Sequence, residues 1–465
     1  MAEPQDESRT PGARASSVRK GRWVLFTSMA AAVISLVVAA VVISWVRRGE
    51  MACARHGREL LAEAGAALAS RPRVPDEANA APLYALAFAL FVDPGNPVYG
   101  SQPYAARDFA DAGTARHLAD NAGYLAAIRL AQGRTQCDFR PDWAMGVDMR
   151  LSHLSPLRHM VVFLCVAARH EAQMGHPDEA LDRLSMALRA AGDVGDDCLL
   201  CRMSRNSQEK MLVQTLEAVL NESDPGAMAL AKFATDLERS CRERPRLAAA
   251  VRASRAVVSY TLAELLSGRR STASLTDSPE RKAPGLCERV WCLSGRTSGE
   301  LRLYTRYMDD AADAAESPYP ECLDAIKELD VRLERIFVAA PDDHVLVRKM
   351  MGSGGVFGDR SVLLATAESD ASADACLKTA WLALGCRLHK QKTGRWPESL
   401  ADLPTALPGH FRELPRDPFS GRDFVYRRTS AGCLIYSVGR NRQDDGGVPW
   451  RSLPSGGDLP LELKR

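Results

Sequence analysis

One pair of cysteines in this sequence has a spacing that could do chemistry. Cys198 and Cys201 form its only Cys-x-x-Cys motif. Such a pair can be a redox dithiol, half of a zinc site, or two incidental thiols near a helix start. No second motif at zinc-finger spacing is present and no βαβ pattern surrounds the pair, which favours incidental thiols or a simple disulfide. Cys287 and Cys292 receive the same interpretation.

Other residue types with catalytic potential do not form a known constellation. His159, His170 and His176 are spaced by eleven and six residues, which does not place them on one helical face as metal ligands. The sequence lacks the HExxH, GxSxG and Walker patterns. Glycines at residues 351–358 lack the Lys-Ser/Thr ending of a phosphate-binding loop and predict a flexible loop. We therefore predict that the protein is not an enzyme.

Composition indicates a folded chain with a preference for helices. Hydrophobic residues make up 46% and charged residues 25% of the sequence, which excludes a disordered chain. The formal net charge is +2 with both signs interleaved, so no nucleic acid partner is expected. Aromatic residues are few, at 6%, and Ala and Leu are abundant, which favours helices over sheets. The 12 cysteines are irregularly spaced and do not define a disulfide scaffold.

Residues 23–46 contain no charged side chain and predict a transmembrane helix. A helix of this length covers the ~30 Å hydrocarbon core of a bilayer, and Trp23 and Trp45 fit its two interfaces. A cleaved signal peptide is the alternative, but its apolar stretch is shorter, and Arg47-Arg48 is a poor cleavage context. We expect residues 1–22 to be a basic cytoplasmic tail, and the rest to be an extracytoplasmic body held in the inner membrane by this single pass.

Residues 47–266 predict a helical body. Apolar periodicity and stop signals indicate helices over residues 78–92, 112–130, 157–174, 177–191, 208–220, 225–242 and 246–266. Residues 267–285 are rich in Ser, Arg and Pro and predict a linker or loop. A further helical region is expected over residues 286–373, with a helix at 323–338.

Two of these helices carry small residues where an antiparallel pair would cross. Ala168, Gly175, Ala180, Leu184 and Ala187 hold this pattern. The spacing resembles a tetratricopeptide repeat, although Glu171 replaces the usual aromatic residue of the first helix. A fainter match near residue 84 does not lie at a multiple of the ~34-residue period. The resemblance implies irregular helical hairpins of tetratricopeptide type rather than a regular array.

Residues 374–465 form a different module. A helix is expected at residues 374–392, followed by Trp396-Pro397-Glu398-Ser399-Leu400 and then by Leu414-Pro415-Arg416-Asp417-Pro418-Phe419. Residues 423–427 and 433–438 alternate with period two and predict a β-hairpin. Asp444-Asp445-Gly446-Gly447 and then Asp458 follow the hairpin.

The order of these motifs resembles the globular half of type II secretion major pseudopilins. It is also similar to the tail of uncharacterised single-pass membrane proteins of planctomycete-type bacteria. In pseudopilins the loop after the hairpin binds calcium, so the resemblance implies Asp444, Asp445 and Asp458 as calcium ligands, while a plain Asp/Gly turn needs no ion. The apolar segment lacks the glutamate of a pilin stem, which argues against assembly into a pilus.

The sequence thus predicts a mainly α protein with a single transmembrane helix, a tetratricopeptide-like body and a small α+β C-terminal module. The first functional hypothesis is a non-enzymatic, membrane-anchored scaffold that binds a protein partner of unknown identity. The alternative, which rests on the analogy alone, is an accessory component of a secretion or pilus-like envelope machine.

Overall fold

The computed structural model describes residues 12–69, 73–93, 95, 108–266, 296–339, 361–407, 409, 411–449 and 457–464. The fold is mainly helical with one small three-stranded antiparallel sheet, as predicted. Residues 1–11 of the expected basic tail, the expected linker at 267–285, Cys287, Cys292 and the glycine loop at 351–358 lie outside the described residues.

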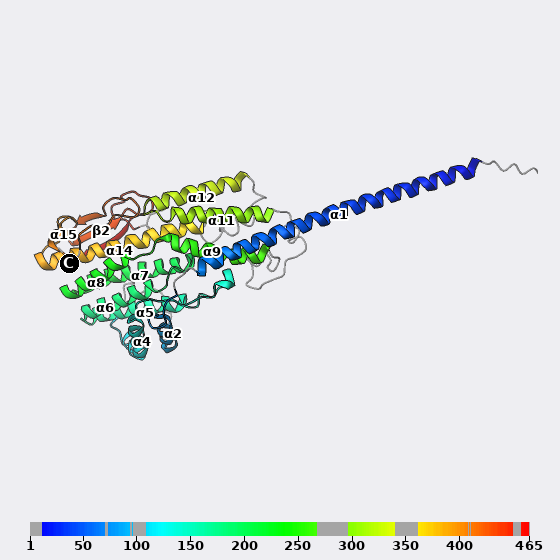
Figure 1. Cartoon of the computed structure of the whole chain (residues 1–465). Coiled ribbons are helices and arrows are strands. Elements are labelled where there is room, and N and C mark those ends of the chain that lie inside the picture. The colour runs from blue at the N-terminus through cyan, green and yellow to red at the C-terminus, as the bar shows by residue number, and fades with distance from the viewer. Residues whose placement is uncertain are drawn as a thin grey trace, which may run out of the picture.

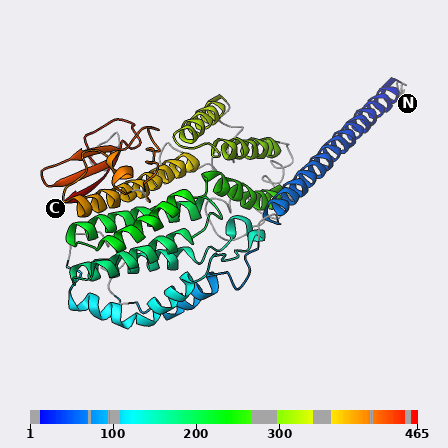
Figure 2. The same cartoon turned by 60° about the vertical axis from the view of Figure 1, so that its left-hand side comes forward.

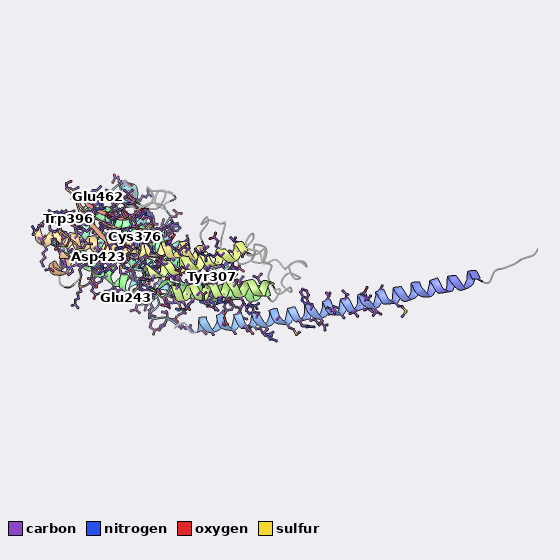
Figure 3. All side chains as sticks on the ribbon, turned by 90° about the horizontal axis from the view of Figure 1, so that it is seen from above. Glu243, Tyr307, Cys376, Trp396, Asp423 and Glu462 are labelled. Carbon is purple, nitrogen blue, oxygen red and sulfur yellow. The ribbon has the colours of Figure 1, made fainter. Side chains whose placement is uncertain are left out.

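A single long helix, α1 (Gly12–Ala69), projects from the body (Figure 1, Figure 3). Its C-terminal part packs against α9 (Leu247–Leu266). The large apolar side chains described between Met29 and Trp45 are exposed, Leu36 for example at 70%. Among the described residues, no helix combines the length and the apolar character that crossing a membrane requires. The transmembrane segment at residues 23–46 therefore stays a prediction.

The body is a stack of helices that begins with α2 (Ala81–Leu90), α3 (Ala112–Asp120) and α4 (Ala122–Gln132) (Figure 2). Sequence analysis expected one helix over residues 112–130, but two are present. Asn121 separates them because its side chain accepts a hydrogen bond from Val92 N at 2.9 Å and donates one to Val92 O at 3.0 Å. The break thus ties the end of α2 to the α3–α4 corner.

The middle of the stack follows the predicted order of helices. A short 3-10 helix, η2 (Trp143–Asp148), is followed by α5 (Leu154–Gln173) and α6 (Pro177–Gly192), which pack along one another. Gly175 connects them with φ +85, a conformation that favours glycine. Next come α7 (Leu199–Glu222) and α8 (Ala227–Arg242). The small residues predicted at the helix crossing, Ala168, Ala180 and Ala187, are fully buried.

The last helices lie across this stack. α11 (Arg296–Ala314) packs on α9 and on α12 (Glu321–Ala339). α14 (Val362–Thr393) packs along both α7 and α8 and carries a Ser361 cap that accepts a hydrogen bond from Leu364 N. It runs without interruption through residue 374, where sequence analysis placed the start of the C-terminal module, and ends at Gly394 with φ +79.

The C-terminal module covers one side of α14. After a short helix, α15 (Asp402–Ala406), come β1 (Val425–Arg428), β2 (Gly432–Ser437) and β3 (Leu459–Lys464) in the order β1-β2-β3. The labelled Trp396, Asp423 and Glu462 lie at the end of the body opposite α1 (Figure 3). β2 and β3 pack on α14, and β3 also contacts α7. The sheet is thereby attached to the helical stack.

Candidate functional site

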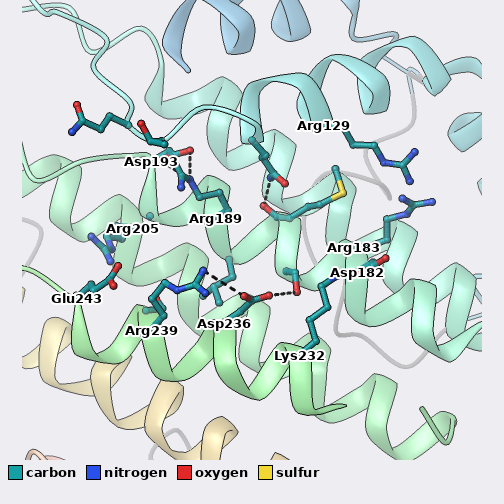
Figure 4. A pocket seen from close by; sticks show the side chains of 18 of the residues that line it. Arg129, Asp182, Arg183, Arg189, Asp193, Arg205, Lys232, Asp236, Arg239 and Glu243 are labelled. Carbon is teal, nitrogen blue, oxygen red and sulfur yellow. Dashed lines mark hydrogen bonds and ion pairs between the residues drawn. The ribbon is translucent and has the colours of Figure 1, made fainter. Parts of the chain in front are cut away.

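A groove of about 680 Å³ runs between α4, α6 and α8. The sequence of α6 accounts for its position: Ala180, Leu184, Ala187 and Ala191 repeat at helical spacing and are buried. The polar residues between them, including Asp182 and Ser185, line the groove. Figure 4 shows Asp182 there beside Lys232. One face of α6 thus holds the core while the other lines the groove.

Ion pairs and hydrogen bonds connect the two long walls of the groove. Lys232 Nζ of α8 lies 2.5 Å from Asp182 Oδ1 of α6. One helical turn along, Ser185 Oγ donates a hydrogen bond of 2.9 Å to Asp236 Oδ2. The hydrogen bond with Asp182 raises the pKa of Lys232, so the ammonium stays charged at neutral pH. These contacts connect α6 and α8 across the groove.

A buried hydrogen-bond chain closes the far side of the groove. Tyr84 of α2 donates a hydrogen bond of 2.8 Å to Asp193 Oδ2, and Arg189 Nε lies 3.0 Å from the same carboxylate. Burial raises the pKa of Asp193, and the charge of Arg189 opposes that rise. These hydrogen bonds link α2 to α6 and to Asp193, the residue after α6, so this side of the groove is polar.

The lining of the groove carries an excess of positive charge. Its basic side chains are Arg129, Arg183, Arg189, Arg205, Lys232 and Arg239, and its acidic ones are Asp182, Asp193, Asp236 and Glu243. The lining residues by themselves have a formal charge of +2. Carboxylates outside the lining pair with two of these arginines, Glu171 with Arg183, and Asp196 and Glu209 with Arg205.

Two of the arginines lie at one end of the groove. Arg129 makes no ion pair with any residue in the described part of the chain, and Arg183 Nε is buried without a hydrogen-bond partner there. The only described carboxylate paired with Arg183 is Glu171, at 3.2 Å from Nη2. Both arginines point toward the same end of the groove (Figure 4). An anionic ligand would meet two guanidinium groups there.

The three aspartates predicted to bind calcium lie in the turn region after β2, with different partners. Asp444 accepts hydrogen bonds from Tyr436 Oη at 2.7 Å and from Arg427 Nη2 at 3.0 Å. Asp445 Oδ2 accepts one from Asn441 at 2.7 Å. Each carboxylate is therefore already engaged by a donor of the protein.

Asp458 differs from its two neighbours. Its side chain is fully buried, Oδ2 accepts a hydrogen bond of 2.6 Å from Gly447 N, and Oδ1 has no partner among the described residues. Burial raises its pKa. No group of three or more His, Cys, Asp or Glu side chains within the described ranges is arranged to hold a metal ion. The calcium ligands thus stay a prediction, and Asp458 offers a buried oxygen without a hydrogen-bond partner among the described residues.

The histidines of residues 153–176 do not converge. His153 stacks on Phe139 with ring centroids 4.3 Å apart. His170 Nδ1 lies 2.8 Å from Phe109 O, and His176 lies beside Glu171. These are interhelical and surface positions, as expected from a spacing that does not place the histidines on one helical face.

The sequence does not predict the groove, although the spacing of Asp182, Ser185 and Arg189 on one helix indicates a polar face. The missing information was the identity of the opposite wall. No protein family, no curated protein and no solved structure matches this chain. The groove geometry is therefore the main basis for a functional assignment.

Proposed function

We propose that this protein is a membrane-anchored, non-enzymatic scaffold of the cell envelope whose α4–α6–α8 groove binds an acidic segment of a partner protein. The observation that carries the proposal is the open groove of about 680 Å³ with six basic and four acidic side chains. Polar contacts connect its walls, and an open groove lined by charged side chains suits binding of a charged segment. The tetratricopeptide-like spacing at residues 164–187 supports a body built for protein binding.

The anchor in this proposal is the part of α1 that spans residues 23–46. Apolar side chains such as Val33, Leu36 and Val41 are exposed over this part of the helix, which extends away from the body (Figure 1). Transfer of such a surface into hydrocarbon is favourable. Basic residues at both ends, Lys20 and Arg22 before the segment and Arg47 and Arg48 after it, suit the two interfaces together with Trp23 and Trp45. In this proposal the N-terminus is cytosolic and the body extracytoplasmic.

Binding is tested with the full chain in detergent micelles and a fluorescent peptide rich in Glu. We expect saturable binding that weakens as salt is added, because the contact is largely electrostatic. The double variant Arg129→Glu, Arg239→Glu reverses two exposed charges of the groove and should weaken binding by roughly tenfold, equivalent to ~1.4 kcal/mol.

The matched control is the double variant Arg116→Glu, Arg252→Glu, which reverses two exposed charges on α3 and α9 outside the groove. Equal affinities for the groove variant and the control would contradict the assignment. Protease protection on spheroplasts tests the anchor separately: digestion of the body from outside supports the stated orientation, and protection opposes it. A pull-down that repeatedly recovers pilins or a secretion ATPase would favour the secretion-machine alternative, whose support is the pseudopilin-like motif order of residues 374–465.

A further inference from the structure

The Cys198–Cys201 pair lies at the start of the longest helix in the middle of the stack. Cys198 is the N-cap of α7 and Cys201 lies in its first turn. The two Sγ atoms are 3.5 Å apart. A disulfide needs ~2.0 Å between sulfurs, so a small rotation of the side chains would join them. The spacing of these two cysteines leaves several interpretations open in the sequence. In the fold, their two sulfur atoms are in contact.

The two thiols differ in access and environment. Cys198 retains 8% exposure, whereas Cys201 is fully buried. When Cys198 is ionised, the Cys201 thiol donates to it, and the backbone N–H groups of Leu200 and Cys201 do so as well. The Cys201 hydrogen bond outweighs burial and lowers the pKa of Cys198 to about 7. The same contact and burial raise the pKa of Cys201. Cys198 is therefore the more reactive of the two.

The charged groups around the pair are already engaged. Asp197 is adjacent and opposes ionisation of Cys198. Asp196 accepts from Arg202 Nη1 at 2.5 Å and from Arg205 Nη1 at 3.4 Å. From α9, Ser254 Oγ accepts a hydrogen bond of 2.8 Å from Leu199 N and fixes the start of α7. The thiols are thus held in place by neighbours that do not need to move for the sulfurs to meet.

We propose that Cys198 and Cys201 are a redox-active dithiol that exchanges with low-molecular-weight disulfides. The Cys198 thiolate attacks one sulfur of the reagent R–S–S–R, whose S–S bond breaks as a mixed disulfide forms and RS⁻ leaves. Cys201 then gives its proton to solvent and attacks Cys198 Sγ. The mixed disulfide breaks and the second RS⁻ leaves.

The exchange is balanced and independent of the groove. Two protein thiols are oxidised to one disulfide, the reagent is reduced, and the two protons released by the protein complete two molecules of RSH. The cysteine pair lies outside the proposed peptide groove, since neither cysteine lines that groove. Cys165 of α5 provides an internal comparison, because it is fully buried and burial raises the pKa of its thiol to about 12.

The test uses the full chain in detergent micelles with oxidised glutathione as the reagent. After an acid quench and alkylation of free thiols in denaturant, peptide mass spectrometry reads the peptide that contains both cysteines. We expect the wild-type peptide to lose two hydrogen atoms and to take up no alkylating agent. In Cys201→Ser, glutathione should accumulate on Cys198, whereas Cys198→Ser should leave Cys201 free. Cys165→Ser should behave as wild type.

Several outcomes would overturn the inference. A doubly alkylated wild-type peptide means that the pair does not oxidise, and a glutathione adduct without an internal disulfide means that Cys201 does not resolve it. Circular dichroism establishes whether Cys201→Ser is folded. If it is not, the wild-type peptide alone decides, because its internal disulfide is read without any variant.

Discussion

Arg202 Nε donates a hydrogen bond of 2.6 Å to Asp370 Oδ1 and so joins α7 to α14 across 168 residues of sequence. The carboxylate also accepts from Arg244 Nη2 at 2.8 Å and from Tyr319 Oη at 2.7 Å. Both Arg202 and Asp370 are 1% exposed. Burial alone would raise the pKa of Asp370, but Arg244 and Arg202 hold it well below its usual range.

Removing the charge of Asp370 should destabilise the whole stack. Asp370→Asn leaves the guanidinium groups of Arg202 and Arg244 buried without their common counter-ion, a change that costs about 3–5 kcal/mol in comparable buried pairs. The midpoint of urea unfolding, followed by circular dichroism, measures the loss.

A surface pair provides the matched control for Asp370. Glu316→Gln removes a carboxylate that pairs with Arg252 at an exposed position, with side chains 46% and 53% exposed. We expect a change below about 1 kcal/mol, because exposed pairs are screened by solvent. If the two variants lose equal free energy of unfolding, burial does not increase the contribution of the Arg202–Asp370 pair to stability.

Attachment of the C-terminal module to α14 depends on a glycine. A Cβ at Gly385 would lie 2.7 Å from Phe411 Cζ and 3.0 Å from Leu403 Cδ1. Gly385→Ala should therefore loosen the packing of α15 and Phe411 on α14, with a loss of about 1–3 kcal/mol. Limited proteolysis should cut the C-terminal module faster in this variant.

The control for this prediction is Gly123→Ala on α4, where a Cβ meets nothing within 4 Å. Alanine is the better helix former, so this variant should be neutral or more stable by about 0.5–1 kcal/mol. If Gly385→Ala is as resistant to protease as Gly123→Ala, the added methyl group does not loosen the packing of α15 on α14, and the prediction is wrong.

Local signals in the sequence were sufficient for most helices. Residues 177–191 were predicted and Pro177–Gly192 is observed, because Pro177 at the first turn, Gly175 before it and an apolar period are all local. The strand β3 was not predicted, since Pro460 argues against a strand interior. It is tolerated because β3 pairs with β2 alone and forms an edge.

Long-range features were beyond local reasoning. The sequence around Asp370 does not predict that its side chain is buried. The fold can bury it because Arg202 and Arg244, which are distant in the sequence, supply the counter-ions. The groove likewise depends on Lys232 meeting Asp182 across two helices. Spacing within one segment can indicate a polar face, but it does not name the helix that lies opposite.

The buried His153 should make stability fall in mild acid. Burial lowers the pKa of His153 to about 4 from an ordinary 6.5. Between these pH values the unfolded chain binds a proton that the folded chain does not, so stability decreases as pH falls from about 6.5 to about 4. The full effect is about 3 kcal/mol. In His153→Gln this part of the pH dependence should vanish.

Urea midpoints of both proteins between pH 7 and pH 4 measure this contribution, and only their difference matters, since the carboxylates titrate in both. If wild type loses more stability than His153→Gln as pH falls, the low pKa of His153 in the folded protein is supported. Curves that stay parallel across this range would mean that His153 is protonated equally well in the folded state.

Calcium binding at the turn after β2 would require Asp444 to leave Arg427, which holds it at 3.0 Å. Asp458 already offers Oδ1 without a protein donor, and a divalent ion would favour ionisation of this buried carboxyl. We therefore expect Arg427→Ala to bind calcium more tightly than wild type and to show the larger rise in melting temperature when calcium replaces chelator. In Asp458→Asn the rise should be lost, since that change removes the charge of the carboxylate whose Oδ1 has no hydrogen-bond partner among the described residues. Melting temperatures that do not respond to calcium in either wild type or Arg427→Ala would exclude Asp444, Asp445 and Asp458 as calcium ligands, because the competing guanidinium would no longer explain the lack of binding.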